Sequence, residues 1–278
     1  MKIGVKIGPA LDRSQLRQAA EQAEAMGFHS VWLSERVAVP LDKPHPYQPM
    51  VDPWVALAFV AAVTERVVLG TSVSQIALRP PVLMARELAT LDRLSGGNRL
   101  IVGAGAGWVQ EEFTSTGVPF QARGGRLGEF VQVLHHLWTK PGQPWHGKHF
   151  DIPDVGMVQP LTTGGPPIYI GAGAPPGLRR AAKYGDGFLA TPFPPDAIAG
   201  FRARLLEMRQ KYGRSGPFPV FTQAPPPESV ENAQKMVADY AAAGVDGLIL
   251  ANFADKPVDF TSKPDIFRAL LELAAAAG

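Results

Sequence analysis

The chain has 278 residues, of which 46% are hydrophobic and 19% are charged, as in ordinary globular proteins with a sizeable core. Its formal net charge is +2 and its longest basic run is the pair Arg179 and Arg180, so no nucleic-acid partner is expected. The chain contains no cysteine, which excludes disulfide bonds, thiolate metal sites and cysteine nucleophiles.

The apolar runs of the chain are too short for a membrane protein. The longest, residues 55–63, is about half the length of a membrane-spanning helix. The N-terminal segment is interrupted by Lys6, Gly8 and Asp12, which is not the pattern of a secretory signal peptide. We therefore expect a cytoplasmic protein with no membrane partner.

Short apolar segments alternate with helix-period segments along the whole chain, which is typical of repeated βα units and a parallel sheet. Eight segments are expected to be strands, namely residues 2–8, 30–35, 67–73, 100–105, 167–173, 187–191, 219–223 and 247–252. Five glycines follow helical segments, where a left-handed residue can end a helix: Gly27, Gly96, Gly185, Gly213 and Gly244. This pattern predicts an α/β fold, a single (β/α)8 TIM barrel forming one domain over residues 1–278. A doubly wound sheet is the alternative.

Two segments exceed the minimal repeat. Residues 36–52 follow the second strand directly, so they belong at the C-terminal mouth of the barrel, where such folds build their sites. Residues 139–166 form an insertion after the helix that follows strand 4, either over the mouth or at the bottom of the barrel. Within it, His146, His149 and Asp151 have a loosely metal-like spacing, but a loop hairpin is the favoured interpretation and no metal site is predicted.

Gly171, Ala172, Gly173 and Ala174 connect the fifth strand to a helix that begins near Pro175. Glycines let backbone N–H groups approach an anion, and a helix N-terminus adds positive potential, so this turn is a candidate phosphate site. A tight βα turn that needs glycine only for steric reasons is the alternative.

The fourth strand runs into Gly103, Gly105, Ala106, Gly107 and Trp108. Small residues at a barrel mouth can form a floor for a flat ring. Trp108 would then border that ring on one side. Ordinary packing of small against large layers inside a barrel is the alternative.

Lys6 alternates with Ile3, Val5 and Ile7, so it is expected to point into the barrel while the other three face the helices. A buried lysine can form a Schiff base or hold an anion. Pairing of Lys6 with an inward carboxylate such as Glu35 is the structural alternative.

Several stretches together resemble the bacterial luciferase-like superfamily and, within it, the oxidoreductases that depend on coenzyme F420, a deazaflavin. They are GFHSVWLSE (27–35), AVTERVVLGTSV (62–73), RPP (79–81), ATLDRLSGG (89–97), GAGAGW (103–108), EEF (111–113), IYIGAG (168–173) and YGDG (184–187). Their order and spacing match over about residues 1–192, whereas the last two βα units match only in kind.

The resemblance implies a (β/α)8 barrel, usually a homodimer, with a flavin or deazaflavin at the C-terminal mouth. It implies a non-prolyl cis peptide between Ser72 and Val73, beneath the cofactor ring. It places the cofactor phosphate at the turn after the fifth strand, and Asp186 of the signature is interpreted as structural. The candidate cofactor-binding residues are Ser72, Val73, Gly105, Ala106, Gly107, Gly171, Ala172, Gly173, Ala174 and Thr191.

The chain departs from the family at two positions. The second strand of family members often ends in Asp/Glu-His, and that histidine is catalytic in the family's glucose-6-phosphate dehydrogenase, but this chain has Glu35-Arg36. Trp108 stands where a glutamate acts as that enzyme's acid, so oxidation of a sugar phosphate by the same mechanism is not expected. Arg36 is permanently charged, which suits clamping an anion or polarising a carbonyl. The candidate catalytic residues are Glu35, Arg36 and Trp108.

The predicted function is hydride transfer between coenzyme F420 and a small organic substrate. The nearest alternative is an FMN-dependent monooxygenase of the same superfamily. A non-redox aldolase using Lys6 and a cofactor-binding paralogue without turnover are further alternatives.

Overall fold

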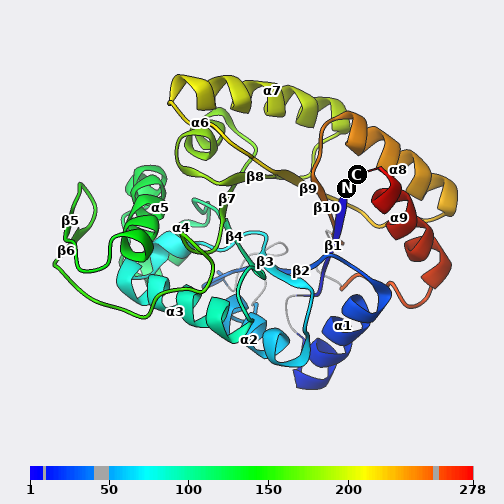
Figure 1. The fold of residues 1–278 in the computed structure, drawn as a ribbon, viewed down its shortest axis with the longest axis horizontal. Helices are drawn as coiled ribbons and strands as arrows, with labels where there is room; N and C mark the ends of the chain where they lie inside the picture. Colours follow the sequence, from blue (N-terminus) through cyan, green and yellow to red (C-terminus); the bar gives the residue numbers. More distant parts are fainter. Residues whose placement is uncertain (9–10, 41–49, 253–256, 278) are drawn as a thin grey trace.

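Eight parallel strands close into a barrel in the computed structural model, which describes residues 1–8, 11–40, 50–252 and 257–277 (Figure 1). The barrel strands are β1 (Lys2–Lys6), β2 (Ser30–Leu33), β3 (Val68–Thr71), β4 (Leu100–Ala104), β7 (Ile168–Ala172), β8 (Gly187–Ala190), β9 (Val220–Ala224) and β10 (Gly247–Leu250). They follow chain order around the barrel, and β1 pairs with both β2 and β10 to close it. The eight predicted strands and the (β/α)8 fold are confirmed.

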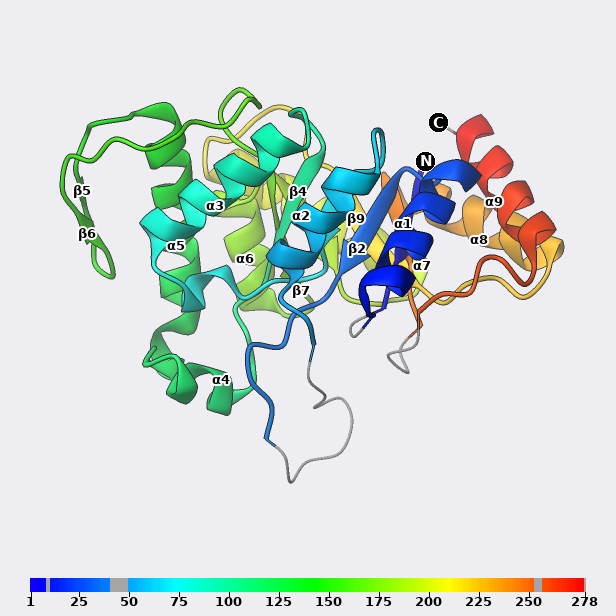
Figure 2. The ribbon, with the colours of Figure 1, turned by 90° about the horizontal axis from the view of Figure 1, so that it is seen from below.

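Helices surround the barrel and cover the outer face of the strands (Figure 1). They are α1 (Arg13–Met26), α2 (Pro53–Val63), α3 (Pro81–Leu94), α5 (Arg123–Thr139), α6 (Pro175–Tyr184), α7 (Pro195–Lys211), α8 (Val230–Ala242) and α9 (Pro264–Ala276). The short α4 (Gln110–Ser115) lies apart from them, below the barrel in Figure 2, on the segment that follows β4. Within the described part of the chain, no helix combines the length and apolar character needed to cross a bilayer.

Four of the five predicted glycine caps are confirmed. Gly27, Gly96, Gly213 and Gly244 have φ values of 94°, 90°, 68° and 74°, in the left-handed region. The prediction for Gly185 was wrong, because its φ and ψ are −77° and 153° and the chain passes directly from α6 toward β8. Space is limited there, since a Cβ atom would lie 3.0 Å from the carbonyl oxygens of Ala181 in α6 and Gly187 in β8.

The predicted insertion is a two-stranded antiparallel hairpin of β5 (Trp145–His146) and β6 (Asp151–Ile152), at the edge of the molecule beside α5 (Figures 1 and 2). The ring centroids of Phe150 and Phe130 on α5 are 5.4 Å apart, so the hairpin packs on the outside of that helix. His146 Nδ1 lies 2.6 Å from Asp151 Oδ1 across the hairpin. Among the described residues, no three His, Asp or Glu side chains gather as they would around a metal ion.

The strands divide their side chains between two cores, as the alternation along β1 predicts. Ile3, Val5 and Ile7 pack outward against the helices. A separate inner cluster fills the barrel and consists of Trp32, Ile101, Tyr169, Leu189, Phe221 and Ile249. The expected inward direction of Lys6 is confirmed, because this residue lines the cavity at the mouth described below.

Trp32 is fully buried inside the barrel, and two glycines make room for its indole ring. Gly4 on β1 and Gly70 on β3 flank it, and a Cβ atom built on them would lie 2.5 Å and 2.3 Å from Trp32 atoms. The Trp32 indole N–H donates a hydrogen bond to the Ser30 hydroxyl at 2.8 Å, which satisfies its polar group. Large and small residues on adjacent strands therefore complement each other in this layer.

We expect Gly70→Ala to lower the free energy of unfolding by about 1–3 kcal/mol, because the added methyl group overpacks the barrel against Trp32. Urea denaturation followed by circular dichroism measures the change. Gly200→Ala in α7 is the matched control, since a Cβ atom there meets nothing within 4 Å and helix propensity favours alanine. A Gly70→Ala protein as stable as the wild type would contradict this account of the barrel core.

Candidate active site

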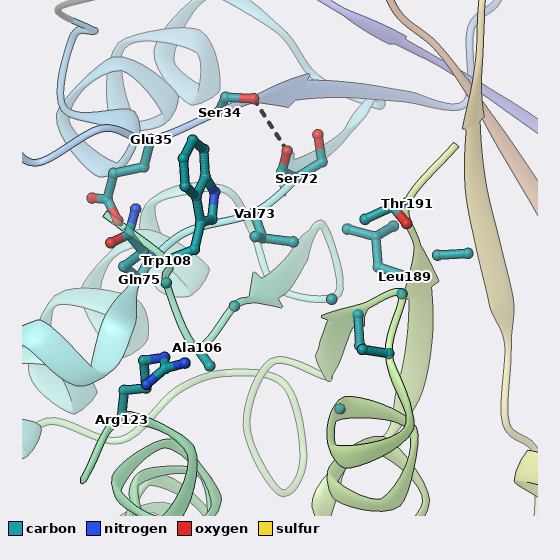
Figure 3. A pocket seen from close by; sticks show the side chains of 18 of the residues that line it. Ser34, Glu35, Ser72, Val73, Gln75, Ala106, Trp108, Arg123, Leu189 and Thr191 are labelled. Atoms are coloured by element: carbon teal, nitrogen blue, oxygen red, sulfur yellow. Dashed lines mark hydrogen bonds between the residues drawn. The ribbon is translucent and has the colours of Figure 1, made fainter. Parts of the chain in front are cut away.

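A cavity of about 870 Å³ opens at the C-terminal ends of the barrel strands (Figure 3). Every predicted catalytic and cofactor-binding residue lines it, although these residues come from five different strand ends. The lining comprises Lys6, Ser34, Glu35, Arg36, Met50, Ser72, Val73, Gln75, Gly105, Ala106, Gly107, Trp108, Gln121, Arg123, Gly124, Gly171, Ala172, Gly173, Ala174, Pro176, Gly177, Arg180, Leu189, Ala190, Thr191, Pro192 and Gln223. Residues 41–49 of the predicted mouth segment lie outside the described residues.

The floor of the cavity is the end of β3. The peptide bond between Ser72 and Val73 is cis, as the resemblance implied. Figure 3 shows Ser72 and Val73 between Trp108 and Glu35 on one side and Leu189 and Thr191 on the other. The backbone there is held by the Ser34 hydroxyl, which donates a hydrogen bond to the Ser72 carbonyl oxygen at 3.1 Å.

Val73 fits between two glycines on neighbouring strand ends. A Cβ atom on Gly105 would lie 2.6 Å from one Val73 methyl group, and a Cβ atom on Gly171 would lie 2.5 Å from the other. Any larger residue at either position would displace the Val73 side chain. The glycines after β4 and in β7 are therefore needed to shape the floor. This agrees with both interpretations of residues 103–108, a floor for a flat ring and the packing of small against large residues.

Glu35 connects two strand ends through a buried carboxylate, which is 3% exposed. Its Oε2 accepts hydrogen bonds from the Ser74 hydroxyl at 2.7 Å and the Gln75 backbone N–H at 2.6 Å. Its Oε1 accepts one from the Arg79 guanidinium at 2.5 Å. These are the contacts of a structural anchor, and a role of Glu35 in catalysis stays a prediction.

Arg79 extends this anchor to the rim of the barrel. Its Nη2 also lies 2.8 Å from Asp52 Oδ2, and Asp52 caps the N-terminus of α2. Burial by itself would lower the pKa of Arg79, but the hydrogen bond to Glu35 and the charges of Glu35 and Asp52 raise it above its ordinary value. The guanidinium is therefore a permanent cation that joins β2, α2 and the segment after β3.

A second buried carboxylate, Glu112 on α4, lies behind the cavity wall. Its Oε1 accepts hydrogen bonds from the Val37 backbone N–H at 2.9 Å and the Gln75 amide at 3.1 Å. Burial raises the pKa of Glu112, and these hydrogen bonds only partly oppose that effect. Glu112 thus orients Gln75, a cavity residue that the sequence analysis did not single out.

Arg36 and Trp108 form one wall of the cavity. The Arg36 guanidinium carbon lies 4.6 Å from the centroid of the Trp108 ring, in a cation–π arrangement. Trp108 is 51% exposed, so the stacked pair faces the opening. The Arg36 Nε atom is buried and has no hydrogen-bond partner among the described residues, which leaves a donor beside the cavity.

The turn after β7 meets the cavity at the N-terminus of α6. Ala174 is the N-cap residue of this helix, and its side chain makes no capping hydrogen bond. A Cβ atom on Gly173 would lie 2.6 Å from the Thr191 hydroxyl oxygen, so glycine keeps the turn close to the end of β8. Residues 171–174 and the first turn of α6 line the cavity, so the positive end of a helix lies beside it. Pro175 and Pro176 have no backbone N–H, so donors for an anion would come from the turn itself.

Cations outnumber anions in the lining. Lys6, Arg36, Arg123 and Arg180 carry positive charge there, whereas Glu35 is the one carboxylate among the lining residues that the structure describes. Arg123 and Arg180 were missed by the sequence analysis. Arg123 did have one unusual feature in the sequence, because a basic residue at the start of a helix opposes the helix dipole.

The residues present fit a planar, polar and anionic cofactor. The Ser72 hydroxyl and the Gln75 Oε1 atom line the cavity, are buried, and have no hydrogen-bond partner among the described residues. Such atoms are normally satisfied, so they provide polar positions for a bound ring. The glycine-lined floor, the α6 turn and the cationic lining supply space and charge for the remaining parts of the group.

A family model and related sequences both relate this chain to one family of proteins. A family model described as luciferase-like monooxygenase matches residues 1–268. An uncharacterised Mycobacterium tuberculosis protein is 32% identical over 214 residues, covering 72% of this chain and 73% of that protein. The F420-dependent glucose-6-phosphate dehydrogenase of Amycolatopsis mediterranei is 33% identical over 207 residues, covering 69% of this chain and 57% of that enzyme.

Solved structures share the fold. An F420-dependent secondary alcohol dehydrogenase in complex with an F420-acetone adduct has a TM-score of 0.82 at 18% identity, covering 100% of this chain and 99% of that one. The monooxygenase RslO1 from Streptomyces bottropensis has a TM-score of 0.78 at 21% identity, covering 99% of each chain.

We expect Glu35→Gln to lower the free energy of unfolding by about 3 kcal/mol, because it leaves the partly buried Arg79 cation without its nearest carboxylate. Chemical denaturation of Glu35→Gln, Arg79→Met and the double variant measures the coupling between the two residues. The double variant should lose clearly less than the sum of the single losses. Strictly additive losses would contradict the anchoring role.

Proposed function

Because this chain belongs to the luciferase-like monooxygenase family, we propose that it is an oxidoreductase that moves a hydride between coenzyme F420 and a small organic substrate. One observation carries the proposal. The predicted cofactor-binding and catalytic residues, from five strand ends, line a single cavity at the barrel mouth, and the charged residues of its described lining are mainly cations.

Relatives support F420 over FMN. Glucose-6-phosphate dehydrogenases described as F420-dependent reach 33% and 36% identity to this chain in Amycolatopsis mediterranei and Kineococcus radiotolerans. The alignments cover only 57% and 52% of those enzymes, so their activity is not transferred as a whole. The stretches around the cis peptide and around residues 95–98 resemble deazaflavin-dependent members, which favours the same cofactor.

When bound, the deazaflavin would supply hydride chemistry at C5 of its ring, and the protein would supply position and surroundings. Val73, with the glycines on either side, would support the ring. The Ser72 hydroxyl and the Gln75 amide would hydrogen-bond to it, and the turn at Gly173 and Ala174 would bind its phosphate.

Arg36 and Trp108 would define the substrate side of the cavity. Trp108 covers the guanidinium and excludes water from one of its faces, which strengthens the interaction of Arg36 with a carbonyl or an anionic group. Arg36 and Trp108 replace the histidine and glutamate of the family's glucose-6-phosphate dehydrogenase, so we propose a substrate other than glucose 6-phosphate.

The main alternative is an FMN-dependent monooxygenase, since the description of the family names monooxygenase activity. An aldolase using Lys6 has no support from the family, although Lys6 does line the cavity. Membership of a redox family makes Lys6 more readily understood as part of the cationic lining.

Titration of the purified protein with each cofactor tests the proposal. We expect oxidised or reduced F420 to bind at least about tenfold more tightly than FMN, measured by calorimetry and by changes in cofactor absorbance and fluorescence. Tight FMN binding without F420 binding would overturn the proposal in favour of the monooxygenase. Borohydride trapping of a carbonyl substrate on Lys6 would overturn it in favour of the aldolase.

The α6 turn offers a test that separates stability from binding. Ala174→Asp and Ala174→Asn should both stabilise the protein, by about 1 kcal/mol, because each supplies the missing N-cap side chain. The Asp variant should bind cofactor at least about tenfold more weakly than the Asn variant, since like charges about 4 Å apart at an effective dielectric near 20 repel by roughly 4 kcal/mol. Equal affinities in the two variants would place the phosphate elsewhere.

A further inference from the structure

Arg123 and Arg180 form a cationic pair at one end of the cavity. Arg123 begins α5, Arg180 lies in α6, and both side chains line the cavity beside Gly124. The Arg180 Nε donates a hydrogen bond to the Gly124 carbonyl oxygen at 2.8 Å. A Cβ atom on Gly124 would lie 2.4 Å from the Arg180 guanidinium, so glycine at this position lets the two helices bring the cations together.

Contacts within the protein leave most of the N–H donors of Arg123 and Arg180 without a partner of opposite charge among the described residues. Arg123 donates one hydrogen bond, to the Phe120 carbonyl oxygen at 3.1 Å, and its guanidinium carbon lies 4.0 Å from the Phe120 ring centroid. Among the described residues, neither arginine forms an ion pair with a carboxylate. Each guanidinium has five N–H groups, so several donors on each remain for a ligand.

The surroundings add positive potential. The pair lies at the N-terminal end of α5 and beside the turn that begins α6. Burial, and then the charge of Arg123, lower the pKa of Arg180, so the two cations are close enough to repel each other. An anion that binds beside two such cations reduces the repulsion between them.

We propose that Arg123 and Arg180 bind carboxylates of the cofactor beyond its phosphate, and that this pair selects a cofactor with a polyanionic tail. The inference rests on the proposed function. The phosphate is already provided for by the turn at residues 171–174, so the pair is available for a further anionic group. Coenzyme F420 continues past its phosphodiester into a chain of glutamates, whereas FMN ends at its phosphate.

Planar guanidinium groups bind carboxylates in a bidentate, charge-assisted manner, and two adjacent ones suit successive carboxylates of one chain. This pair comes from α5 and α6, whereas Arg36 and Trp108, which would face the substrate, follow β2 and β4. The cavity thus has one cationic region for the substrate and one for the tail of the cofactor.

The test compares two ligands with the same ring and phosphate: F420 with its glutamate chain, and the phospholactate form that lacks every glutamate. The wild type should bind the glutamylated form about tenfold more tightly, with a steeper dependence of affinity on salt. The Arg123→Gln/Arg180→Gln variant should lose that difference and still bind the phospholactate form with wild-type affinity. Arg179→Gln is the matched control, because Arg179 is exposed on α6 and does not line the cavity.

The outcomes separate this inference from the proposed function. Equal affinity of the folded wild type for both forms would overturn the inference and leave the proposed function standing. If the double variant bound both forms of F420 more weakly by the same factor, the inference would also be overturned, since the pair would then bind the phosphate itself. Failure of the wild type to bind either form would overturn the proposed function and the inference together. Thermal melting and circular dichroism check that each variant is folded.

Discussion

The cavity depends on one steric constraint, the fit of Val73 between Gly105 and Gly171. One Val73 methyl group occupies the space that a Cβ atom on Gly105 would fill, and the other occupies the space of a Cβ atom on Gly171. Three neighbouring strand ends therefore have to be specified together, because enlarging either small residue would displace the large one. The same complementarity occurs deeper in the barrel, where Gly4 and Gly70 accommodate Trp32. In a barrel packed in this way, the hydrophobic side chains end below the mouth, and a cavity opens above them.

The polar residues at the mouth divide into those that hold the protein together and those that remain for a ligand. Glu35 and Arg79 use their charges on each other and on Ser74 and Asp52, which ties the strand ends in place. Arg123 and Arg180 instead use mainly carbonyl oxygens of the protein and keep most of their donors. Burial makes an unused polar group costly, so the unused donors and acceptors around the cavity indicate where a ligand is expected.

The position of the insertion in the chain, residues 139–166, did not determine whether it lies over the barrel mouth or away from it. It leaves α5 at the end remote from the mouth and packs beside that helix through Phe150 and the Glu129 carboxylate, which accepts hydrogen bonds from the backbone N–H groups of His149 and Phe150. None of residues 139–166 lines the cavity. The hairpin therefore contributes to the outer surface of α5, and the site is built from the strand ends and the short segments that follow them.

The amino-acid sequence by itself determined the eight strands and the closed barrel, and its resemblance to a family supplied part of the cavity lining, without Gln75, Arg123 and Arg180. Those features follow from local periodicity, from glycine at positions that need it, and from motifs whose members lie close together in the chain. Tertiary structure alone decided that Glu35 anchors the segment after β3, that Gly185 is extended, and that Arg180 reaches Gly124, 56 positions away. Contacts of this kind arise because closing the barrel brings distant strand ends and helix ends together, and no local pattern records which side chains will then meet.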